Sequence, residues 1–319
     1  MDFDVFNGDA DGIVALHQYR LQHPNPEATL ITGVKRDIKL LSRIQEQHNG
    51  HITVFDISLD SNRDALTALL NQDNDITYID HHFAGTIPDC NQLTTHIDPS
   101  PSICTSLIVD KLLGGRYRSW AIAAAFGDNL HDSAQEAAAT LSLNKEQLAE
   151  LRELGELLNY NGYGASLDDL HFAPDDLYQA LHPYDDPFSF INDSSDIKIL
   201  QQGFKEDMER ALGQQEMNPG QKNRVYLFPN AAWSRRVAGV FSNLRAREKK
   251  DAAHALIVEN DDATLRISVR APLHNRKDAD TLCRAFPTGG GRTAAAGINM
   301  LPPEMLDTFL AQFHSTYSA

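Results

Sequence analysis

Short apolar runs that end in polar or charged residues recur through the first 130 residues of the chain. Three of these runs are of the β type, at residues 3–6, 52–55 and 76–79. Helical patterns alternate with them, the first starting near Gly12, and this alternation predicts βαβ units with a parallel sheet. Residues 134–158 are rich in Ala, Leu, Glu and Gln, and their periodicity predicts one or two helices.

A turn-rich and Asp-rich stretch near residues 182–195 separates this alternation from a second α/β pattern. The elements predicted there are helices at 196–217, 233–250 and 303–316, and strands at 224–228, 255–259 and 264–270. A glycine-rich segment, residues 289–297, is predicted to be a loop that precedes a short apolar run. The fold class is therefore α/β, with one domain at 1–190 and a second at 191–319.

Each predicted strand of the first domain ends in side chains that can bind a cation. They are Asn7, Asp9 and Asp11 after the first strand, Asp56 after the second, and Asp80, His81 and His82 after the third, while Asp128 follows the apolar run 120–126. Because the carboxyl ends of parallel strands meet at one edge of a sheet, we expect these groups to converge. Carboxylates and imidazoles gathered there would repel one another unless cations neutralised them. The sequence therefore indicates a hydrolase with two metal ions.

Several of these motifs have simpler explanations when taken alone. The segment Asp9-Ala10-Asp11-Gly12 also suits a surface turn or a calcium loop, but the twelfth position of such a loop, which should be Glu, is Arg20. Asp56 alone suits a helix N-cap, because a helix is expected to start nearby. The triplet Asp80-His81-His82 is more specific, since its two imidazoles point in different directions. Asp128 follows a buried run and needs a partner, for which a metal is the best candidate.

Charge is distributed unevenly along the chain. Residues 1–195 carry 11 Lys and Arg against 30 Asp and Glu, a balance of −19, whereas residues 196–319 carry 17 against 14, a balance of +3. An acidic first domain suits metal binding, and a basic second domain could hold a small anionic substrate, although acidic surfaces also aid solubility. The two balances sum to −16, and their asymmetry disfavours a strong, sequence-independent grip on long DNA, which requires many phosphate contacts.

Bulk composition narrows the class of protein further. A length of 319 residues with 42% apolar content suits two cores. No run approaches the ~18 apolar residues of a membrane helix, and the first four residues do not form a signal peptide. The three cysteines lack paired spacing, which excludes a disulfide framework and a Cys-type zinc site. We expect a cytoplasmic protein with no membrane partner.

Taken in order, these motifs resemble those of the DHH–DHHA1 phosphoesterase superfamily, which includes the RecJ exonucleases. The resemblance rests on Asp9-Ala10-Asp11-Gly12, Asp56, Asp80-His81-His82, Asp128 and the glycine-rich segment from Gly289 to Gly297. It spans nearly the whole chain, whose length matches the short branch that hydrolyses nanoRNA and pGpG. It implies a parallel-sheet domain with helices on both faces, a smaller α/β domain and a cleft between them.

The resemblance also implies roles for individual residues. Two Mn²⁺ ions, with Mg²⁺ or Co²⁺ able to substitute, would be held by Asn7 and Asp9 at the first position, by Asp11, His81 and Asp128 at the second, and by Asp56 as the bridge. His82 would contact the scissile phosphate, and Asp80 would orient the imidazoles. Asn7 departs from the family, which usually has His or Asp there, and a neutral amide oxygen is a weaker ligand.

In the second domain, the resemblance implies that Ser268, Arg270, Gly289, Gly290, Gly291 and Arg292 bind substrate. A plain turn is the simpler explanation for the glycines. Arg292 stands where the family usually has His, and its planar fork favours a phosphate or a guanine edge. Arg235 and Arg236 are expected to face either the cleft or solvent, while Trp233, Phe241 and the late Phe residues are expected in the core.

The function that follows is hydrolysis of short linear oligonucleotides or dinucleotides to 5′-mononucleotides, with pGpG as the best single substrate. The alternatives are a phosphatase acting on phosphoadenosine-type nucleotides, a cyclic-dinucleotide phosphodiesterase, or a nucleotide-binding sensor with a degraded metal site. The expected partner is the short nucleotide itself, not long DNA. The sequence allows a homodimer without fixing the oligomeric state.

Overall fold

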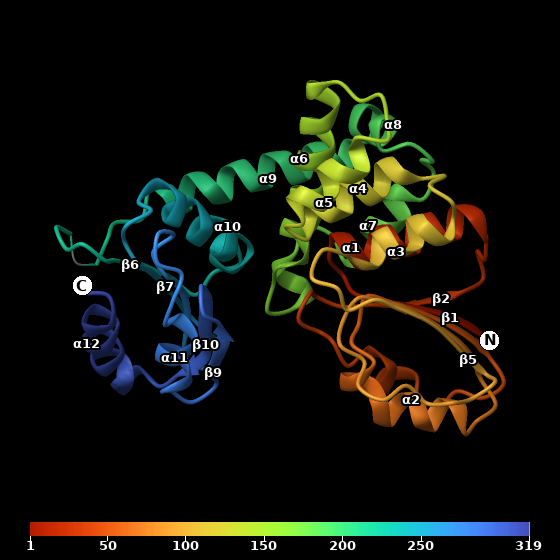
Figure 1. The fold of residues 1–319 in the computed structure, drawn as a ribbon, viewed down its shortest axis with the longest axis horizontal. Helices are drawn as coiled ribbons and strands as arrows, with labels where there is room; N and C mark the ends of the chain where they lie inside the picture. Colours follow the sequence, from red (N-terminus) through yellow and green to blue (C-terminus); the bar gives the residue numbers. More distant parts are fainter. Residues whose placement is uncertain (218, 319) are drawn as a thin grey trace. The chain divides into compact units, whose positions relative to one another are not determined.

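Two compact units make up the computed structural model, which describes residues 1–217 and 219–318 (Figure 1). The first unit is Met1–Gly203 and the second is Phe204–Ala319. The division lies within helix α9 (Ser195–Leu212), beyond the boundary predicted at residue 190. The predicted linker region is largely helical, because α8 (Pro187–Asp193) runs almost directly into α9.

The first unit is built on a five-stranded sheet in which every pair of neighbouring strands is parallel, in the order β2-β1-β3-β4-β5. Its strands are β1 (Asp2–Phe6), β2 (Thr29–Ile31), β3 (His51–Phe55), β4 (Asp75–Asp80) and β5 (Leu93–Ile97). The three predicted strands form its centre. The edge strands β2 and β5 were not predicted. None of their residues is buried, so they lack the apolar run that marks the central strands.

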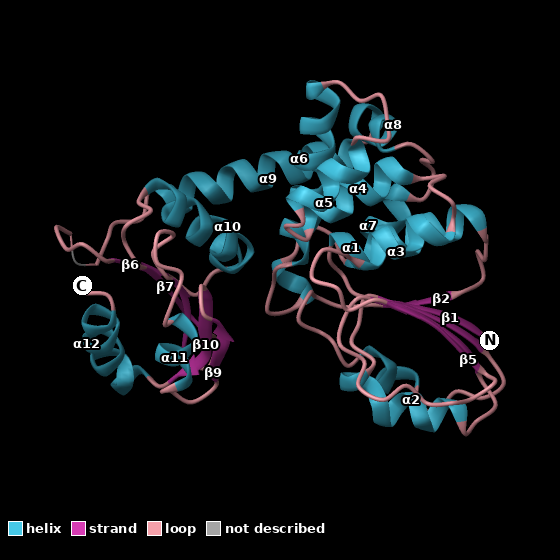
Figure 2. Ribbon diagram, in the orientation of Figure 1, coloured by secondary structure: helices cyan, strands magenta, loops and turns pink. Residues whose placement is uncertain are grey.

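Helices cover both faces of this sheet, as predicted (Figure 2). They are α1 (Ala10–Gln22), α2 (Arg63–Leu70), α3 (Thr105–Leu112), α4 (Arg118–Gly127), α5 (His131–Ala138), α6 (Lys145–Gly162) and α7 (Pro174–Leu181). Helix α2 lies on one face, where Leu66 and Leu69 join Val5, Val54 and Tyr78 in a buried cluster. Helices α1, α3 and α4 lie on the other face.

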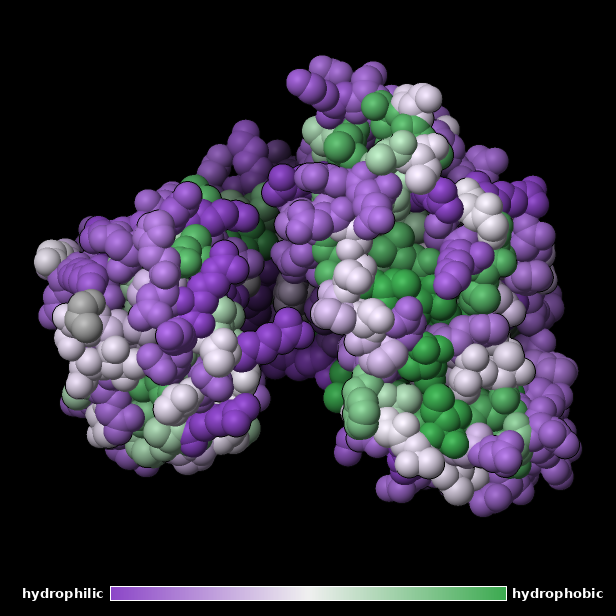
Figure 3. Space-filling model, viewed as in Figure 1, coloured by the Kyte–Doolittle hydropathy of each residue, from purple (hydrophilic) through white to green (hydrophobic). Residues whose placement is uncertain are grey.

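The second unit is a smaller α/β unit around a mixed sheet in the order β6-β7-β8-β10-β9. Its strands are β6 (Arg224–Phe228), β7 (His254–Glu259), β8 (Leu265–Arg270), β9 (Gly289–Arg292) and β10 (Ala295–Leu301). Its further helices are α10 (Ala232–Glu248), α11 (Ala279–Arg284) and α12 (Leu306–Thr316). Phe241, Phe309 and Phe313 are buried, as predicted. In the view of Figure 3, hydrophilic side chains cover most of this unit.

The prediction of a loop at residues 289–297 is wrong. Gly289–Arg292 forms the edge strand β9, which turns at residues 293–294 and pairs antiparallel with β10. Gly291 has φ 135°, and a Cβ there would lie 2.5 Å from the Cα of Ala296, so this position requires glycine. Glycine is depleted in strands, and here the hairpin pairing outweighs that preference.

Among the described residues, no helix combines the length and the apolar character that a membrane span requires.

Candidate metal centre

The central strands of the first unit end at the same level. Phe6 of β1 lies opposite Phe55 of β3, and Phe55 lies opposite Ile79 of β4. The residues that follow therefore emerge side by side at one edge of the sheet. The Asn7 N–H donates to the carbonyl of Phe55 at 3.2 Å, and the Asp56 N–H donates to the carbonyl of Ile79 at 3.1 Å, which extends the ladder into the site.

Asp56 sits at the centre of this edge in a left-handed backbone conformation with φ 58°. Residues other than glycine rarely adopt this conformation, and they concentrate at functional sites when they do. Its carboxylate accepts a hydrogen bond from the Thr105 hydroxyl at 3.1 Å. The alternative role as a helix N-cap is wrong, because the next helical turn begins at Asp60 and its N-cap position is Leu59.

The segment Asp9-Ala10-Asp11-Gly12 turns the chain from β1 directly into α1. Asp9 is the N-cap, and its Oδ1 accepts from the backbone N–H groups of Asp11 at 3.0 Å and Gly12 at 3.1 Å. A Cβ at Gly12 would lie 2.2 Å from the carbonyl oxygen of Asn7, so only glycine permits this tight turn. The turn brings two carboxylates to the end of one strand, and neither the surface-turn nor the calcium-loop explanation applies.

Asp11 is fixed by a second helix. Its two carboxylate oxygens accept hydrogen bonds from the backbone N–H groups of Thr105 and Ser106, each at 2.7 Å, at the start of α3. Unpaired N–H groups at a helix N-terminus favour a bound anion. The carboxylate is thus held in one orientation, buried at the base of the site.

The adjacent histidines are oriented by different partners. The His81 ring pairs through Nδ1 with the carbonyl oxygen of Ile103 at 3.0 Å, which leaves Nε2 facing Asp56 Oδ1 at 3.4 Å. The His82 ring pairs through Nδ1 with Asp80 Oδ1 at 2.7 Å. Such contacts at one ring nitrogen set the tautomer and leave the other nitrogen for a metal or a substrate. Asp80 is fully buried and also accepts from the N–H of His81.

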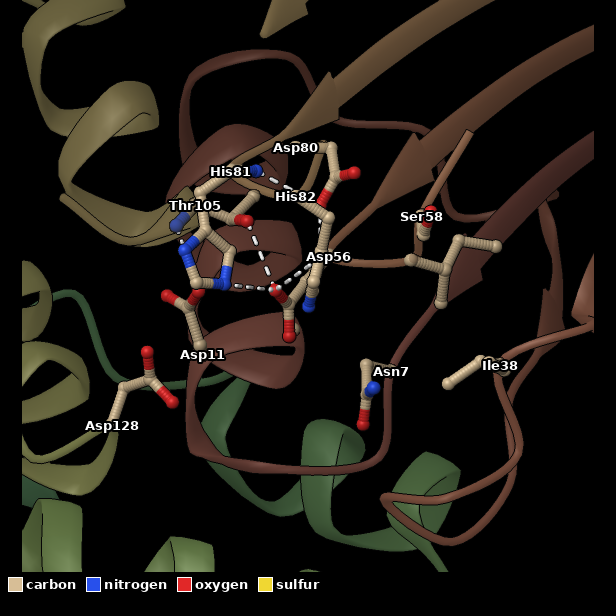
Figure 4. A network of polar contacts seen from close by, with 12 residues as sticks. Asn7, Asp11, Ile38, Asp56, Ser58, Asp80, His81, His82, Thr105 and Asp128 are labelled. Atoms are coloured by element: carbon tan, nitrogen blue, oxygen red, sulfur yellow. Dashed lines mark hydrogen bonds and ion pairs between the residues drawn. The ribbon is translucent and has the colours of Figure 1, made fainter. Parts of the chain in front are cut away.

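Two sets of ligand atoms lie close enough to share an ion. Asp11, His81 and Asp128 form one set and Asp56, His81 and His82 form another, each with its atoms within 4.8 Å of one another. Figure 4 shows Asp11, Asp56 and His81 directed toward a common centre, with Asp128 beside Asp11. The first set coincides with the residues that the resemblance assigns to the second ion. A carboxylate and imidazole donor set of this kind fits Mn²⁺ or another divalent ion.

The electrostatics of the cluster also favour a cation. Burial and the neighbouring carboxylates raise the pKa of Asp56 well above its ordinary value. Burial raises the pKa of Asp128 to about 6, although Lys35 opposes the shift. Burial alone would lower the pKa of His82, but the bond to Asp80 outweighs it and the net shift is upward. A divalent ion would relieve the repulsion between the neighbouring carboxylates that contributes to the shifts of Asp56 and Asp128.

Lys35 is a member of the site that the sequence analysis missed. Its Nζ lies 2.6 Å from Asp9 Oδ2 and 3.7 Å from Asp128 Oδ1, and it donates to Asn159 Oδ1 at 2.9 Å. It also lies 5.4 Å from the centroid of the Tyr163 ring. Lys35 follows β2, whose end lies at the same sheet edge. The available signal was the short β-type run Thr29–Ile31, in which only Leu30 and Ile31 are apolar.

The residues assigned to the first ion fit that role poorly. Asn7 offers one favourable feature, because its buried Oδ1 accepts no hydrogen bond from the residues that the structure describes. Asp9, however, already caps α1 with Oδ1 and pairs with Lys35 through Oδ2. An ion at this position would have to share Asp9 with an ammonium group.

The predicted substrate residues of the second unit share one sheet. Arg270 ends β8, and its Nε donates to Asn243 Oδ1 of α10 at 2.8 Å, while Ser268 lies two residues earlier. Ala295 pairs with both Arg270 and Arg292, so these three residues form a row and point to one face. Arg292 is exposed at the end of β9.

Two further expectations for this unit have different outcomes. Arg236 faces neither a cleft nor solvent: it is buried, and its Nε pairs with Asp207 at 2.7 Å. This ion pair joins α10 to α9. Trp233 packs on Phe228 with ring centroids 5.1 Å apart, in agreement with a structural role.

No protein-family model matches the chain, and no curated protein matches its sequence. Solved structures match its fold. A manganese-bound RecJ exonuclease has 16% identity and a TM-score of 0.61, with 99% of this chain and 89% of that chain covered. RecJ from Thermus thermophilus in complex with Mn²⁺ has 16% identity and a TM-score of 0.60, with 99% and 51% covered. The pGpG-specific phosphodiesterase PggH from Vibrio cholerae has 13% identity and a TM-score of 0.58, with 100% and 99% covered.

These neighbours belong to the DHH–DHHA1 superfamily. The chain therefore shares the two-unit α/β fold of these structures, in agreement with the fold that the resemblance in its sequence implied.

Proposed function

We propose that the chain is a metal-dependent phosphodiesterase that cleaves a short linear nucleotide, pGpG in particular, to 5′-mononucleotides. The observation that carries the proposal is the convergence of Asp11, His81 and Asp128, with Asp56 beside them, at the ends of parallel strands. The fold supports it, since RecJ structures hold Mn²⁺ or Mg²⁺ and PggH is specific for pGpG.

Four side chains would hold the catalytic ion: Asp11, Asp56, His81 and Asp128. When bound, a divalent ion activates water and neutralises charge on the phosphate, and Mn²⁺ is the first choice, with Mg²⁺ or Co²⁺ as substitutes. The chain's own contacts prepare these ligands. The carbonyl of Ile103 orients His81, and the hydroxyl of Thr105 orients Asp56.

His82 is suited to handle a proton at the phosphate. Asp80 holds its Nδ1, so Nε2 is the ring nitrogen left to meet a substrate. The side chain is 43% exposed, and the hydrogen bond to Asp80 outweighs burial and raises the pKa of the ring, which favours its protonated form. We infer that Nε2–H donates to a phosphate oxygen as negative charge develops there.

An aromatic ring beside the site favours a nucleotide over a bare polyphosphate. Phe83 directly follows His82 and is 73% exposed. Exposed aromatic rings that meet nucleobases stabilise each stacked base by about 1–3 kcal/mol. We infer that Phe83 contacts a base of the substrate.

The second unit supplies cationic groups for an anionic substrate. We propose that Ser268, Arg270 and Arg292 contact its phosphates or a guanine edge. The strand Gly289–Arg292 lies at the edge of its sheet, where backbone N–H groups not used by β10 can also bind an anion. The balance of +3 in residues 196–319, against −19 in residues 1–195, supports a small substrate over a long polymer.

A product assay across substrate classes tests this function. With Mn²⁺, pGpG should yield GMP faster than the enzyme consumes a pentanucleotide, a cyclic dinucleotide, phosphoadenosine phosphate or pyrophosphate. Preferential release of phosphate from phosphoadenosine phosphate would favour the phosphatase alternative. Binding of nucleotide with no product from any substrate would favour a sensor.

A further inference from the structure

The Lys35 ammonium contacts the carboxylate that the family resemblance assigns to the first of two metal ions. We propose that this centre binds a single divalent ion and that the Lys35 ammonium takes the place of the second. The inference rests on the proposed metal centre, and it changes how many ions that centre holds.

Lys35 is built into the site by its backbone as well as by its side chain. Its N–H donates to the carbonyl of Gly162 at 2.9 Å, and its own carbonyl accepts from Asn7 Nδ2 at 3.2 Å. The segment before it packs directly against the β1 motif, because a Cβ on Gly8 would lie 1.9 Å from the carbonyl oxygen of Gly33. Both the position and the direction of Lys35 are therefore constrained.

The ammonium finds the partners that a cation at this position needs. It meets Asp9 Oδ2 at 2.6 Å and Asn159 Oδ1 at 2.9 Å, it faces Asp128 Oδ1 at 3.7 Å, and the Tyr163 ring lies 5.4 Å away. The side chain is only 27% exposed. A carboxylate pair, an amide oxygen and an aromatic ring together stabilise one positive charge.

The remaining donors are poor ligands for a second ion. Asp9 is already paired with the ammonium through Oδ2, and Asn7 is neutral. A divalent ion that shared Asp9 with the ammonium would meet strong repulsion at short range in a partly buried site. An N–H or O–H donor from substrate or water satisfies Asn7 Oδ1 as well as a metal would.

The ligand set on the opposite side of the cluster consists of Asp11, His81 and Asp128. Asp11 and His81 have no ammonium contact among the residues that the structure describes, and Asp128 has only the longer one at 3.7 Å. One ion bound there and Lys35 beside Asp9 would together present three positive charges to a phosphate, with one of them carried permanently by the chain.

Counting the bound ions tests the inference without measuring activity. The full chain is equilibrated with excess Mn²⁺, freed of unbound ion by gel filtration, and examined by elemental analysis and electron paramagnetic resonance. We expect one Mn²⁺ per chain with the six-line spectrum of an isolated ion. Two ions with an exchange-coupled spectrum would overturn the inference and leave the proposed function intact. No bound ion would overturn both.

Variants test whether Lys35 is the reason that the centre binds one ion and not two. The double variant Asn7→His, Lys35→Ala restores a stronger ligand and removes the ammonium, so the count should rise from one to two. Lys35→Arg keeps the charge and should remain at one. Lys39→Ala removes an exposed lysine four residues later and should also remain at one.

A folded double variant, judged by its circular dichroism, that still bound one ion would contradict the role given to Lys35. If the double variant does not fold, the count and spectrum of the unmodified chain decide the question alone.

Discussion

The two units use their sheets differently. In the first, all strands run parallel, so strand ends that are far apart in sequence meet at one edge and bring Asp11, Asp56 and His81 together. In the second, most neighbouring strands are antiparallel, and the cations Arg270 and Arg292 lie in a row across one face. The comparison teaches that the parallel sheet concentrates ligands for chemistry, whereas the mixed sheet spreads contacts suited to binding.

Removing a metal ligand from the edge of the parallel sheet should have the largest effect on activity. His81→Ala deletes an atom common to both ligand sets, so metal content and turnover of pGpG should both be abolished. His51→Ala is the matched control, since His51 is exposed at the opposite end of β3. Turnover that survived His81→Ala would show that the reaction takes place elsewhere.

Breaking the buried ion pair of the second unit should cost stability and spare the metal. Arg236→Met removes a cation that pairs with the buried carboxylate of Asp207, and the loss of one partner of such a buried pair costs about 3 kcal/mol. Denaturant unfolding measures the cost, with Arg235→Met as the neighbouring control. If Arg236→Met abolished Mn²⁺ binding under native conditions, the separation of roles between the units would be wrong.

The first unit should lose stability in mild acid through His17. Burial lowers the pKa of His17 to about 3, although its bond to the carbonyl of Tyr184 opposes the shift. The unfolded chain therefore takes up this proton below about pH 6.5 while the folded chain does not, so stability falls as the pH falls. From pH 6.5 to 5 the loss is about 2 kcal/mol.

The variant His17→Gln isolates this effect. Unfolding free energies measured at both pH values should differ less for the variant than for the unmodified chain. An equal difference would mean that His17 does not carry the acid sensitivity.

The smallest effect is expected at the exposed end of the mixed sheet. Arg292→Ala removes one charged hydrogen bond to substrate, so KM for pGpG should rise about tenfold with kcat nearly unchanged. Arg276→Ala, an exposed arginine of the same unit, should leave KM unchanged. A fall in kcat at constant KM would instead give Arg292 a part in the chemistry.

The apolar runs of the buried strands made much of the fold predictable from sequence. Strands β1, β3 and β4 are apolar because both faces of the sheet are covered, and their polar ends marked the site residues. The edge strand β2 lacks buried residues, and because it was missed, Lys35 was missed with it. The glycines of β9 carry no strand pattern, so only the pairing with β10 reveals that strand.

The local geometry within the site could not be predicted from the sequence either. The left-handed conformation of Asp56 and the capture of Asp11 by the start of α3 depend on contacts between distant segments. The buried pairing of Arg236 with Asp207 likewise depends on how α10 packs on α9.

The most direct test of metal-dependent phosphodiester hydrolysis uses the full chain stripped of metal by a chelator. Mn²⁺ is added back in steps, and the GMP formed from pGpG is measured by chromatography. The account predicts no GMP without metal and a rise with Mn²⁺ that saturates. Undiminished GMP formation in chelator, or intact pGpG at every Mn²⁺ concentration, would contradict it.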